Sequence, residues 1–380
     1  MPMSYDAIIV GLGAMGSATA YQLASRGKSV LGLEQFEAAH DRGSSHGQSR
    51  MIRQAYMEGA FYIPLLKRAY ELWDRLEQES NRSILTITGG LFMGTPESGV
   101  VRDTLAAARE YDLPVAVLEY PELKRRYPLF QPEKEHVGVL ENVVGYLDPE
   151  LAIKTYLECA ARQGADLRFS EAVLRVEISD GGGVRVVTGR DSYEAAQLII
   201  TAGAWSESFL KELTVPVPLK VERLVMHWFR PAHPEWFAPD VCPIWIWEVD
   251  DGIIFYGFPL APGADSVKVA FHTHQRTTCT ADDIERTIAT EEVSEMERYL
   301  TRYVSAVGND HQRSITCMYT STPDGHFAIG RHPSHSQVLV AAGFSGHGFK
   351  FAGVVGEILA ELAIDGKTRH DISAFALDRF

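Results

Sequence analysis

Two kinds of hydrophobic pattern occur along the chain. Short apolar runs, which are typical of buried strands, cover residues 7–10, 29–33, 197–201 and 338–342. Apolar residues at the 3.6-residue spacing of an amphipathic helix cover residues 62–78, 149–163 and 351–362. The pattern therefore predicts an α/β protein, and Asp148 followed by Pro149 marks the expected start of the second of these helices.

Between these segments the pattern is less regular. It predicts strands at 90–93, 137–140, 174–178 and 184–188 and helices at 101–110 and 121–126. From Val221 to Phe271 the chain is rich in aromatic residues and isoleucine, which favours an antiparallel sheet that forms one wall of a pocket. At 380 residues the chain is long enough for two domains, or for a nucleotide-binding domain with a second domain inserted into it.

The first strand runs directly into Gly11, Gly13 and Gly16, which form the G-x-G-x-x-G turn of a dinucleotide-binding unit. Gly11 can make the tight turn, Gly13 allows the backbone to approach a pyrophosphate, and Gly16 allows the next helix to lie close to the strand. That helix is expected to end at Gly27. The second strand then delivers Glu34 to the position where a carboxylate can hold ribose hydroxyls. Because an acid there would repel a 2′-phosphate, the candidate cofactors are FAD and NAD.

Composition and charge narrow the range of partners. The chain has 36 basic and 50 acidic residues, and its formal charge of −14 argues against nucleic acid or an anionic membrane as a partner. No apolar run approaches the roughly 20 residues that span a bilayer, and no basic segment of a signal peptide precedes the first strand. We therefore expect a soluble, cytoplasmic protein.

The cysteines predict neither a disulfide framework nor a zinc site. They lie far apart in the sequence, without any C-x-x-C spacing, at Cys159, Cys242, Cys279 and Cys317. Each is typical of a small, buried apolar residue.

Residues 267–274 alternate as a strand with one apolar and one cationic face. The apolar face would carry Val267, Val269 and Phe271, and the cationic face Lys268, Ala270, His272 and His274. The cationic face would meet either solvent or a pocket. The spacing of the two histidines also suits a metal pair, but no carboxylate or third ligand lies nearby in the sequence, so no metal site is predicted.

Two pairs of basic residues, each three positions apart, suggest an anionic ligand. His347 and Lys350 follow a second glycine turn, at the expected start of the C-terminal helix, where they would add to the positive end of the helix dipole. Arg50 and Arg53 could form a bidentate clamp on a carboxylate. They belong to a polar, glycine-containing segment at 40–53, which we predict to be a loop over the cofactor.

Six segments together closely resemble the monomeric sarcosine oxidase family, which includes N-methyltryptophan oxidase and pipecolate oxidase. They are Gly11-Leu-Gly-Ala-Met-Gly, Ser45-His-Gly-Gln-Ser-Arg-Met-Ile-Arg, Tyr256-Gly-Phe-Pro, Lys268 with His272, Cys317-Met-Tyr-Thr and Ser345-Gly-His-Gly-Phe-Lys. The resemblance covers essentially the whole chain, and the last two segments are far more specific than the glycine turn. It implies a glutathione-reductase-like, FAD-binding Rossmann domain that carries an inserted mixed-sheet substrate domain. We assign residues 1–86, 148–220 and 315–380 to the first domain and residues 87–147 and 221–314 to the second.

The resemblance also implies roles for individual residues. Cofactor contacts are implied for Gly11, Gly13, Gly16, Glu34, Ser45, Cys317, Gly346 and Gly348, with a thioether from Cys317 to the 8α carbon of FAD. Substrate contacts are implied for Arg53, Lys350, Tyr256 and Tyr319, the first two as a clamp on the substrate carboxylate. Catalytic roles are implied for Lys268, Arg50, His272 and His347, of which Lys268 would hold a water near flavin N5 and promote the reaction with oxygen.

The implied activity is the oxidation of sarcosine or a related N-alkyl amino acid by a monomer, with hydride transfer to FAD and reduction of O2 to hydrogen peroxide. A cationic pocket suits this chemistry because it stabilises an anionic reduced flavin. The same charges lower the pKa of a substrate ammonium, which keeps the reacting amine neutral.

Two departures from the family pattern affect the site. The family commonly has His-His-Gly-Asp-Thr where this chain has Ser45 to Ser49, so Gln48 replaces an acid and makes the local charge more positive. The segment around Trp245 and Trp247 is more aromatic than a pocket for sarcosine alone requires. That difference favours a bulkier or cyclic N-alkyl amino acid as substrate.

Three other functions remain open at this point. A D-amino-acid or glycine oxidase-type enzyme would bind FAD noncovalently and leave Cys317 as a core residue. A flavin-binding protein without turnover would use its basic residues only to hold the FAD phosphates. An NAD-dependent dehydrogenase explains neither the Cys317 segment nor the C-terminal glycine turn.

Overall fold

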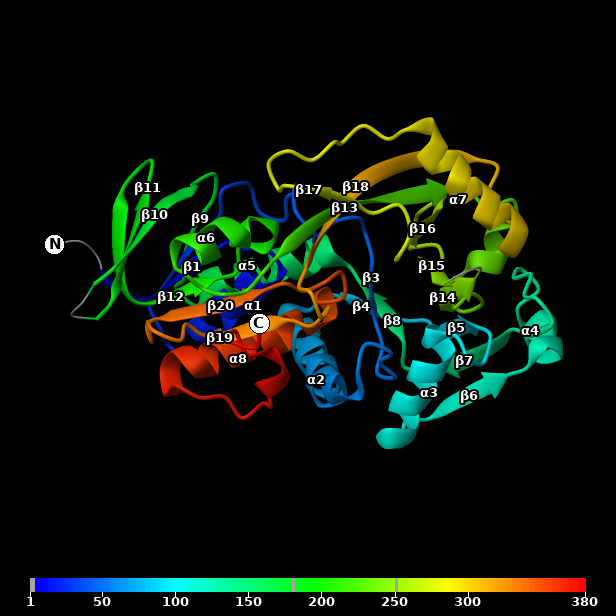
Figure 1. The fold of residues 1–380 in the computed structure, drawn as a ribbon, viewed down its shortest axis with the longest axis horizontal. Helices are drawn as coiled ribbons and strands as arrows, with labels where there is room; N and C mark the ends of the chain where they lie inside the picture. Colours follow the sequence, from blue (N-terminus) through cyan, green and yellow to red (C-terminus); the bar gives the residue numbers. More distant parts are fainter. Residues whose placement is uncertain (1–3, 180–181, 250–251) are drawn as a thin grey trace.

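Two large sheets lie side by side along the long axis of the molecule (Figure 1). The computed structural model describes residues 4–179, 182–249 and 252–380. The first sheet lies on the left in Figure 1 and the second on the right, and the long pair of strands β13 (Lys220–Phe229) and β18 (His311–Ser321) extends between them.

The first sheet has eight strands and contains the dinucleotide-binding unit. Its parallel strands have the order β20 (Val338–Ala342), β12 (Ser192–Ile200), β1 (Ser4–Val10), β2 (Val30–Leu33) and β9 (Asp166–Arg168). The antiparallel strands are β19 (Ala328–Arg331), next to β20, and the hairpin of β10 (Val173–Ile178) and β11 (Val184–Thr188), next to the first half of β12. The register pairs Val10 with both Ile200 and Leu33, so these strands end at one carboxyl edge of the sheet.

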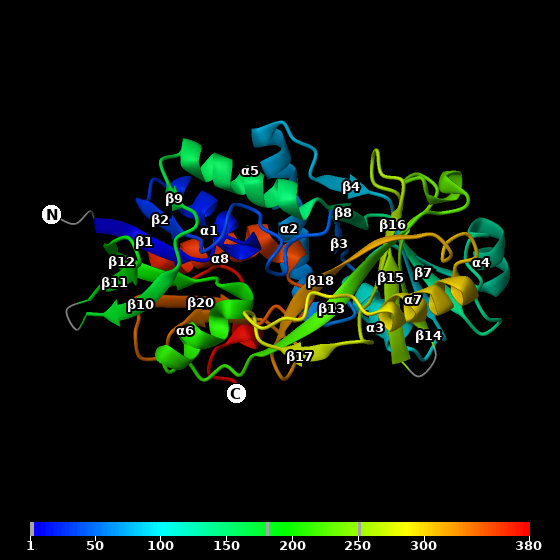
Figure 2. The same cartoon turned by 90° about the horizontal axis from the view of Figure 1, so that it is seen from above.

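Each face of this sheet has its own apolar cover. Four helices cover one face, as seen from above in Figure 2: α1 (Ala14–Ala24), α2 (Ile63–Ser80), α5 (Pro149–Arg162) and α8 (Ala352–Asp365). Ala7 and Ile9 of β1 point into that layer, whereas Ile8 and Val10 point to the other face. There they meet the β10–β11 hairpin and α6 (Ser206–Glu212). Strand β1 is apolar on both faces because both are buried.

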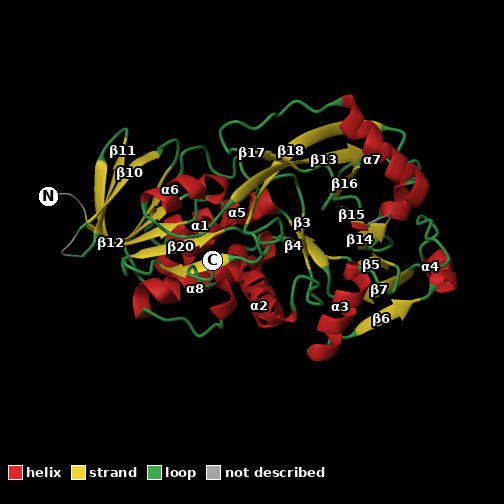
Figure 3. Cartoon of the chain, viewed as in Figure 1, coloured by secondary structure: helices red, strands yellow, loops and turns green. Residues whose placement is uncertain are grey.

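The second sheet has nine strands and is mostly antiparallel. Its order is β17 (Thr277–Cys279), β13, β16 (Val267–Phe271), β15 (Ile253–Gly257), β14 (Ile244–Val249), β5 (Gly90–Gly94), β7 (Val137–Glu141) and β6 (Val115–Leu118), and β18 pairs with β13. Helices α3 (Gly99–Glu110), α4 (Tyr120–Arg126) and α7 (Thr290–Tyr303) surround it (Figure 3). A third, small antiparallel sheet consists of β3 (Arg50–Ile52), β8 (Gly145–Leu147) and β4 (Leu85–Ile87), in that order.

Short helical turns occur at η1 (Ala60–Tyr62), η2 (Gly203–Trp205), η3 (Pro234–Phe237), η5 (Phe349–Phe351) and η6 (Ser373–Phe375). Among the helices of the described ranges, none combines the length and the hydrophobicity needed to cross a bilayer.

The predicted fold class, a Rossmann-type sheet together with a second mixed sheet, is confirmed. The predicted helix at 62–78 is α2, and Asp148 caps α5, since its side chain accepts a hydrogen bond from the Leu151 N–H at 2.9 Å. The predicted boundary at residue 315 falls inside β18, which pairs with β13 along its length. The division of the chain into domains therefore stays a prediction.

The fold differs from the sequence interpretation in several details. The loop predicted over residues 40–53 is interrupted by β3, which pairs with β8. The pattern missed six short strands, β4, β6, β8, β9, β17 and β19. Strand β16 ends at Phe271, and His274 does not share a face with His272. Instead, the His274 ring packs against Phe271, with ring centroids 4.9 Å apart, and its Nε2 lies 3.4 Å from the Glu295 carboxylate.

Candidate active site

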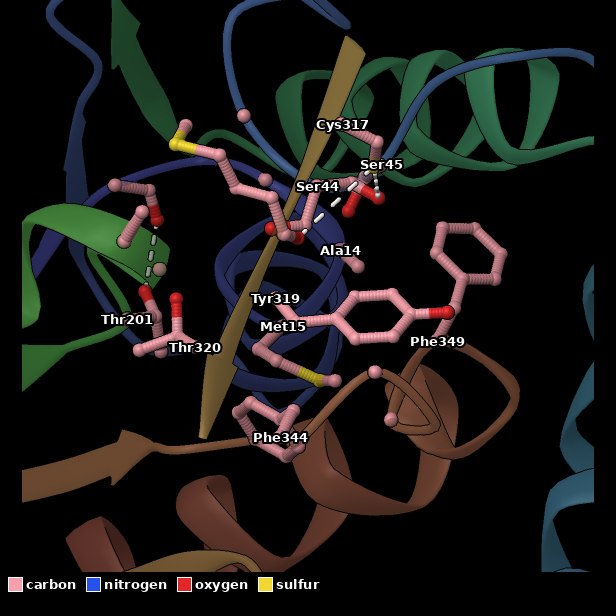
Figure 4. A pocket seen from close by; sticks show the side chains of 18 of the residues that line it. Ala14, Met15, Ser44, Ser45, Thr201, Cys317, Tyr319, Thr320, Phe344 and Phe349 are labelled. Atoms are coloured by element: carbon pink, nitrogen blue, oxygen red, sulfur yellow. Dashed lines mark hydrogen bonds between the residues drawn. The ribbon is translucent and has the colours of Figure 1, made fainter. Parts of the chain in front are cut away.

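A deep cavity begins at the carboxyl edge of the first sheet and extends to the second sheet. It runs from the glycine turn after β1 and from Glu34, past Cys317 on β18, to Lys350 in η5. In Figure 4 Cys317 lies beside Ser44 and Ser45, and the Tyr319 ring extends toward Phe349.

Fourteen of the sixteen predicted site residues line this cavity. They are Gly11, Gly13, Glu34, Ser45, Arg50, Arg53, Tyr256, His272, Cys317, Tyr319, Gly346, His347, Gly348 and Lys350. The other two, Gly16 and Lys268, lie behind its wall.

The glycine turn has the geometry that a pyrophosphate requires. Gly11 has φ +90°, and a Cβ on Gly16 would overlap the Gly11 carbonyl, so both positions require glycine for packing. A Cβ on Gly13 would meet nothing within 4 Å, because this N-cap residue of α1 faces the cavity. An open cradle at a helix N-terminus fits an anionic group such as a pyrophosphate.

Glu34 is fixed as an anion at the end of β2. Its carboxylate accepts hydrogen bonds from the Leu12 N–H at 2.9 Å and the Phe36 N–H at 3.1 Å, and it lies 3.5 Å from His40 Nε2. Although burial raises the pKa of Glu34, these hydrogen bonds hold it below its usual value. A charged carboxylate at this position fits the ribose hydroxyls of a dinucleotide such as FAD.

Cys317 is a buried residue of the cavity wall. It sits in β18 opposite Leu224, and its Sγ lies 3.7 Å from the Ser44 carbonyl oxygen and 3.7 Å from Arg50 Nη2. The sequence context alone is typical of a core cysteine, but the structure turns this thiol toward the cavity and places a guanidinium beside it.

Lys268 is buried and fully engaged by the loop between β2 and β3. Its Nζ donates to the carbonyl oxygens of Gly47 at 2.9 Å and Ser49 at 2.6 Å, and to Ser49 Oγ at 3.1 Å. Burial, together with the neighbouring charge of Arg50, holds the pKa of Lys268 well below its usual value. The cationic face of β16 thus packs inside the protein, and the solvent-exposed alternative is wrong.

Gln48 has its own role in this loop. Its side-chain oxygen accepts a hydrogen bond from Trp228 Nε1 at 2.8 Å. The Glu150 carboxylate, in the first turn of α5, accepts from the N–H groups of Gly47 at 2.6 Å and Gln48 at 3.2 Å. A neighbouring helix therefore supplies the negative charge that the loop sequence lacks.

Arg53 already holds a carboxylate of this chain. Its Nη2 donates to both oxygens of Glu58, each at 2.7 Å, and the Arg53 side chain is buried. Although burial raises the pKa of Glu58, the charges of Arg53, His347 and Lys350 lower it to about 2. We call Arg53, Glu58, His347 and Lys350 the carboxylate-binding cluster. Arg50 is not part of it, because its guanidinium points to Ser44 and Cys317.

Lys350 and His347 are buried on the segment that leads into α8. Lys350 Nζ donates to the His347 carbonyl oxygen at 2.8 Å and to the Tyr56 hydroxyl at 3.2 Å. Burial and Arg53 lower the pKa of Lys350 to about 7, and burial lowers that of His347 to about 4.

His272 and Tyr319 face each other across the wall formed by the second sheet, with His272 Nδ1 3.4 Å from Tyr319 Oη. Burial and Arg276 lower the pKa of His272 to about 3. Near neutral pH His272 and His347 are therefore neutral bases near the charged groups Arg53 and Lys350.

The aromatic segment on β14 does not shape the cavity as the sequence suggested. Trp245 and Trp247 are fully buried in the core under α7, where Phe130 packs edge-on against both rings. Of the described residues in β14, Ile246 lines the cavity. These two tryptophans therefore do not favour a bulkier substrate, contrary to the prediction from the sequence.

Three residues near the site were not predicted from the sequence: Tyr56, Glu58 and Glu150. Tyr56 and Glu58 lie in a loop without a periodic pattern, and Glu150 contacts Gly47 and Gln48, which are distant in the sequence. No sequence motif therefore pointed to these three residues. An acid five residues after a predicted carboxylate-binding arginine is the one signal that could have pointed to Glu58.

A possible metal-binding group lies away from the cavity, where Glu357, Glu361 and His370 approach one another. The Glu357 carboxylate, however, lies 2.8 Å from Arg68 Nη2 and 2.6 Å from Arg369 Nη2. Two guanidinium groups around one carboxylate suit an ion-pair network rather than a cation.

Comparison with known proteins identifies close relatives. The family described as FAD dependent oxidoreductase matches residues 6–362. A monomeric sarcosine oxidase of Streptomyces avermitilis is 45% identical over 378 residues, which cover 99% of this chain and 97% of the relative. An N-methyl-L-tryptophan oxidase of Yersinia pestis is 34% identical over 379 residues, which cover 100% of both chains. The solved structure of NikD, an unusual amino acid oxidase, has a TM-score of 0.87 at 25% identity and covers 98% of this chain and 97% of NikD.

Proposed function

This chain belongs to the monomeric sarcosine oxidase branch of the FAD-dependent oxidoreductase family, and we propose that it oxidises sarcosine or a related N-alkyl amino acid. Electrons from the substrate would pass to O2 and form hydrogen peroxide. One observation carries the proposal: a single cavity joins the dinucleotide cradle and Glu34 at one end to the carboxylate-binding cluster at the other.

The residues of this chain suit FAD. The open side of Gly13 and the N-terminus of α1 would hold the pyrophosphate, and Glu34 the ribose. Cys317 would attach the cofactor through a thioether, since its thiol already faces the cavity beside Arg50. Bound FAD would supply the acceptor for the substrate hydride and return the electrons to O2.

Arg53 and Lys350 would bind the substrate carboxylate. Arg53 presents a planar set of N–H donors that a carboxylate fits, and its Nη2 already donates to both oxygens of the Glu58 carboxylate. A substrate would therefore compete with Glu58 for the same guanidinium. Lys350 would add a positive charge at pH values below its pKa of about 7.

The same cluster would favour the reactive form of the substrate amine. Arg53 and Lys350 lower the pKa of an ammonium bound beside them, because like charges repel. The pKa of His272 is lowered to about 3, so this side chain is neutral near neutral pH and adds no charge beside the substrate amine. Tyr256 and Tyr319 would enclose the substrate on the side of the second sheet.

Lys268 would act on the oxygen reaction from behind the wall. Three loop oxygens accept hydrogen bonds from its Nζ, which suits the ammonium form. As an ammonium it would add a positive charge close to Arg50, and charges preorganised in a dry site stabilise the anions that form when O2 is reduced. A monomeric state and a cytoplasmic location accompany this proposal as predictions.

The test is anaerobic mixing of the purified protein with sarcosine, N-methyl-L-tryptophan, pipecolate and a D-amino acid in turn, while the flavin absorbance is recorded. We expect one of the secondary amines to bleach the flavin, and admission of air to restore it with formation of peroxide. Bleaching by the D-amino acid alone would favour a D-amino-acid oxidase instead. Absence of bleaching by all four compounds would refute the oxidase proposal.

A further inference from the structure

Tyr56 lies directly behind the carboxylate-binding cluster and is not among the described residues that line the cavity. It follows β3 in the chain, and its side chain is fully buried. The Arg53 guanidinium lies over its ring, 4.4 Å from the centroid. The rings of Tyr62, Phe351 and His347 pack around it, with centroids 5.2, 5.6 and 5.8 Å away.

One direction of the Tyr56 hydrogen bonds satisfies both ring nitrogens of His347; the other acceptor near the hydroxyl, the His347 carbonyl oxygen, lies farther away, at 3.3 Å. His347 Nε2 lies 3.0 Å from the Gly325 carbonyl oxygen, which can only accept, so Nε2 carries the ring hydrogen. The ring is neutral near neutral pH because burial lowers the pKa of His347 to about 4, so Nδ1 is bare. Tyr56 Oη, 2.7 Å from this Nδ1, must therefore donate to it.

The Tyr56 oxygen is then left to accept, and Lys350 Nζ lies 3.2 Å away. A second hydrogen bond from Lys350 goes to the His347 carbonyl oxygen at 2.8 Å. An ammonium has three N–H donors, so one remains for a ligand in the cavity that Lys350 lines. One hydroxyl thus links a neutral histidine to a buried ammonium in a directed chain from Lys350 through Tyr56 to His347.

We propose that Tyr56 is a positioning residue for the carboxylate-binding cluster. Its hydroxyl fixes the Nε2–H form of His347 and holds the Lys350 ammonium, and its ring supports the Arg53 guanidinium. The inference rests on the proposed function, because it assigns Tyr56 to the binding of the substrate carboxylate.

The first test compares acetate binding to FAD-loaded wild-type protein and to Tyr56→Phe by calorimetry between pH 5.5 and 9. Acetate is a probe that the enzyme does not oxidise, so binding is measured apart from turnover. We expect the Kd for acetate to rise roughly tenfold to a hundredfold, since the variant removes a hydrogen bond to a charged group.

The pH profile separates positioning from packing. The charged and titratable groups that face Lys350 are Arg53, Glu58, His347 and Tyr56. Wild-type affinity should fall as the pH rises through about 7, where Lys350 loses its proton. Without the Tyr56 oxygen the ammonium is less well stabilised, so this fall should begin at a lower pH in Tyr56→Phe.

Tyr62→Phe is the matched control. Tyr62 is also fully buried in the aromatic group, but its hydroxyl lies 3.3 Å from His326 Nδ1 and away from Lys350. This variant should keep the wild-type affinity and pH profile. In a Lys350→Met background, Tyr56→Phe should weaken acetate binding by less than about threefold, because the hydroxyl acts through the ammonium.

A measurement on the unmodified protein guards against a variant that folds poorly. The 15N chemical shifts of His347 in FAD-loaded protein at pH 7 should show the Nε2–H form. Observation of the Nδ1–H form or of an imidazolium would overturn the inference.

Two further results would overturn it: equal acetate affinity and pH profile in Tyr56→Phe and wild type, or equal weakening in Tyr56→Phe and Tyr62→Phe. If wild type binds acetate as described but oxidises none of the four amines, the proposed function fails and the role of Tyr56 stands. If the amines are oxidised and Tyr56→Phe behaves as wild type, the proposed function stands and the role of Tyr56 fails.

Discussion

Replacement of Glu58 by glutamine tests the central feature of the cluster, the pairing of Arg53 with a carboxylate of the chain itself. Glutamine keeps the length of the side chain and one oxygen acceptor, but it removes the charge. The variant should therefore have two opposite effects. It should destabilise the ligand-free protein and strengthen the binding of an external carboxylate.

The magnitude follows from the geometry. Glu58 makes two contacts of 2.7 Å with a buried guanidinium, and its own side chain is 16% exposed. A lowering of its pKa from 4.5 to about 2 corresponds to about 3 kcal/mol of stability. Removal of one partner of a buried ion pair costs about 3–5 kcal/mol, and the remaining amide oxygen offsets part of it. We expect a loss of about 2–3 kcal/mol in Glu58→Gln.

The pH dependence of this loss has a definite sign. Because the pKa of Glu58 is lower in the folded than in the unfolded protein, its stabilisation is fully present above about pH 4.5 and is lost as the pH falls toward 2. The difference in stability between wild type and variant should be largest at about pH 5–6. It should decrease as the pH rises through about 7, where Lys350, whose ammonium Glu58 stabilises, loses its proton. It should shrink below about pH 4.5.

The assay is thermal unfolding of the FAD-loaded proteins with and without acetate, together with calorimetric titration of acetate. Without ligand, Tm should fall by about 3 °C in the variant. Acetate should bind at least about tenfold more tightly to Glu58→Gln, since it no longer competes with Glu58, and saturating acetate should restore about 1.4 kcal/mol more stability than in wild type.

Glu71→Gln is the matched control, because Glu71 pairs with Arg68 on the surface of α2, where its side chain is 64% exposed. It should change stability by less than about 0.5 kcal/mol and leave acetate binding unaltered. The reasoning is refuted if Glu58→Gln matches wild type in both Tm and acetate affinity, or if Glu71→Gln has an equal effect.

Three further predictions concern the cofactor and oxygen. Gly16→Ala should destabilise the apoprotein by more than about 2 kcal/mol, because its Cβ would overlap the Gly11 carbonyl. Gly13→Ala should leave the apoprotein stable and weaken FAD binding at least about tenfold. Both apoproteins are prepared in a Cys317→Ser background, and equal destabilisation of the two would show that packing at Gly16 is not the cause. Lys268→Met should slow reoxidation by O2 at least about a hundredfold while FAD content is retained, and unchanged reoxidation would favour a flavin-binding protein without turnover. After acid precipitation, flavin colour should stay with the wild-type pellet and pass into the supernatant from Cys317→Ser; colour released from both would exclude the thioether.

Features governed by local geometry could be predicted from the sequence. The glycine turn and the Asp148 cap depend on backbone sterics or on a hydrogen bond within a few residues. The acid at the end of β2 follows from the compact β1–α1–β2 unit, so a short segment is enough to specify all three. The resemblance to the family then pointed to residues most of which line the cavity, where the carboxyl edge of the first sheet meets strands β15 and β18 of the second.

Partners between distant residues could not be predicted in this way. Alternation placed His274 with His272, but β16 ends at Phe271, and beyond a strand the period-2 rule no longer applies. Aromatic composition placed Trp245 and Trp247 near the substrate, yet the face of β14 that carries them packs under α7. Composition gives the amount of apolar surface to bury, but not which face of a sheet meets a helix.

By itself, the sequence determined the dinucleotide-binding unit, the α/β class and the chemical types of the site residues. Only the tertiary structure decided how the charges are distributed among them. It paired Arg53 with Glu58, turned Arg50 toward Cys317, bound Lys268 to loop carbonyls and placed Tyr56 between His347 and Lys350. The physical reason is that a buried charge must find a partner, and several candidates lie within reach once the chain is folded. Which one it takes depends on long-range packing that no local pattern records.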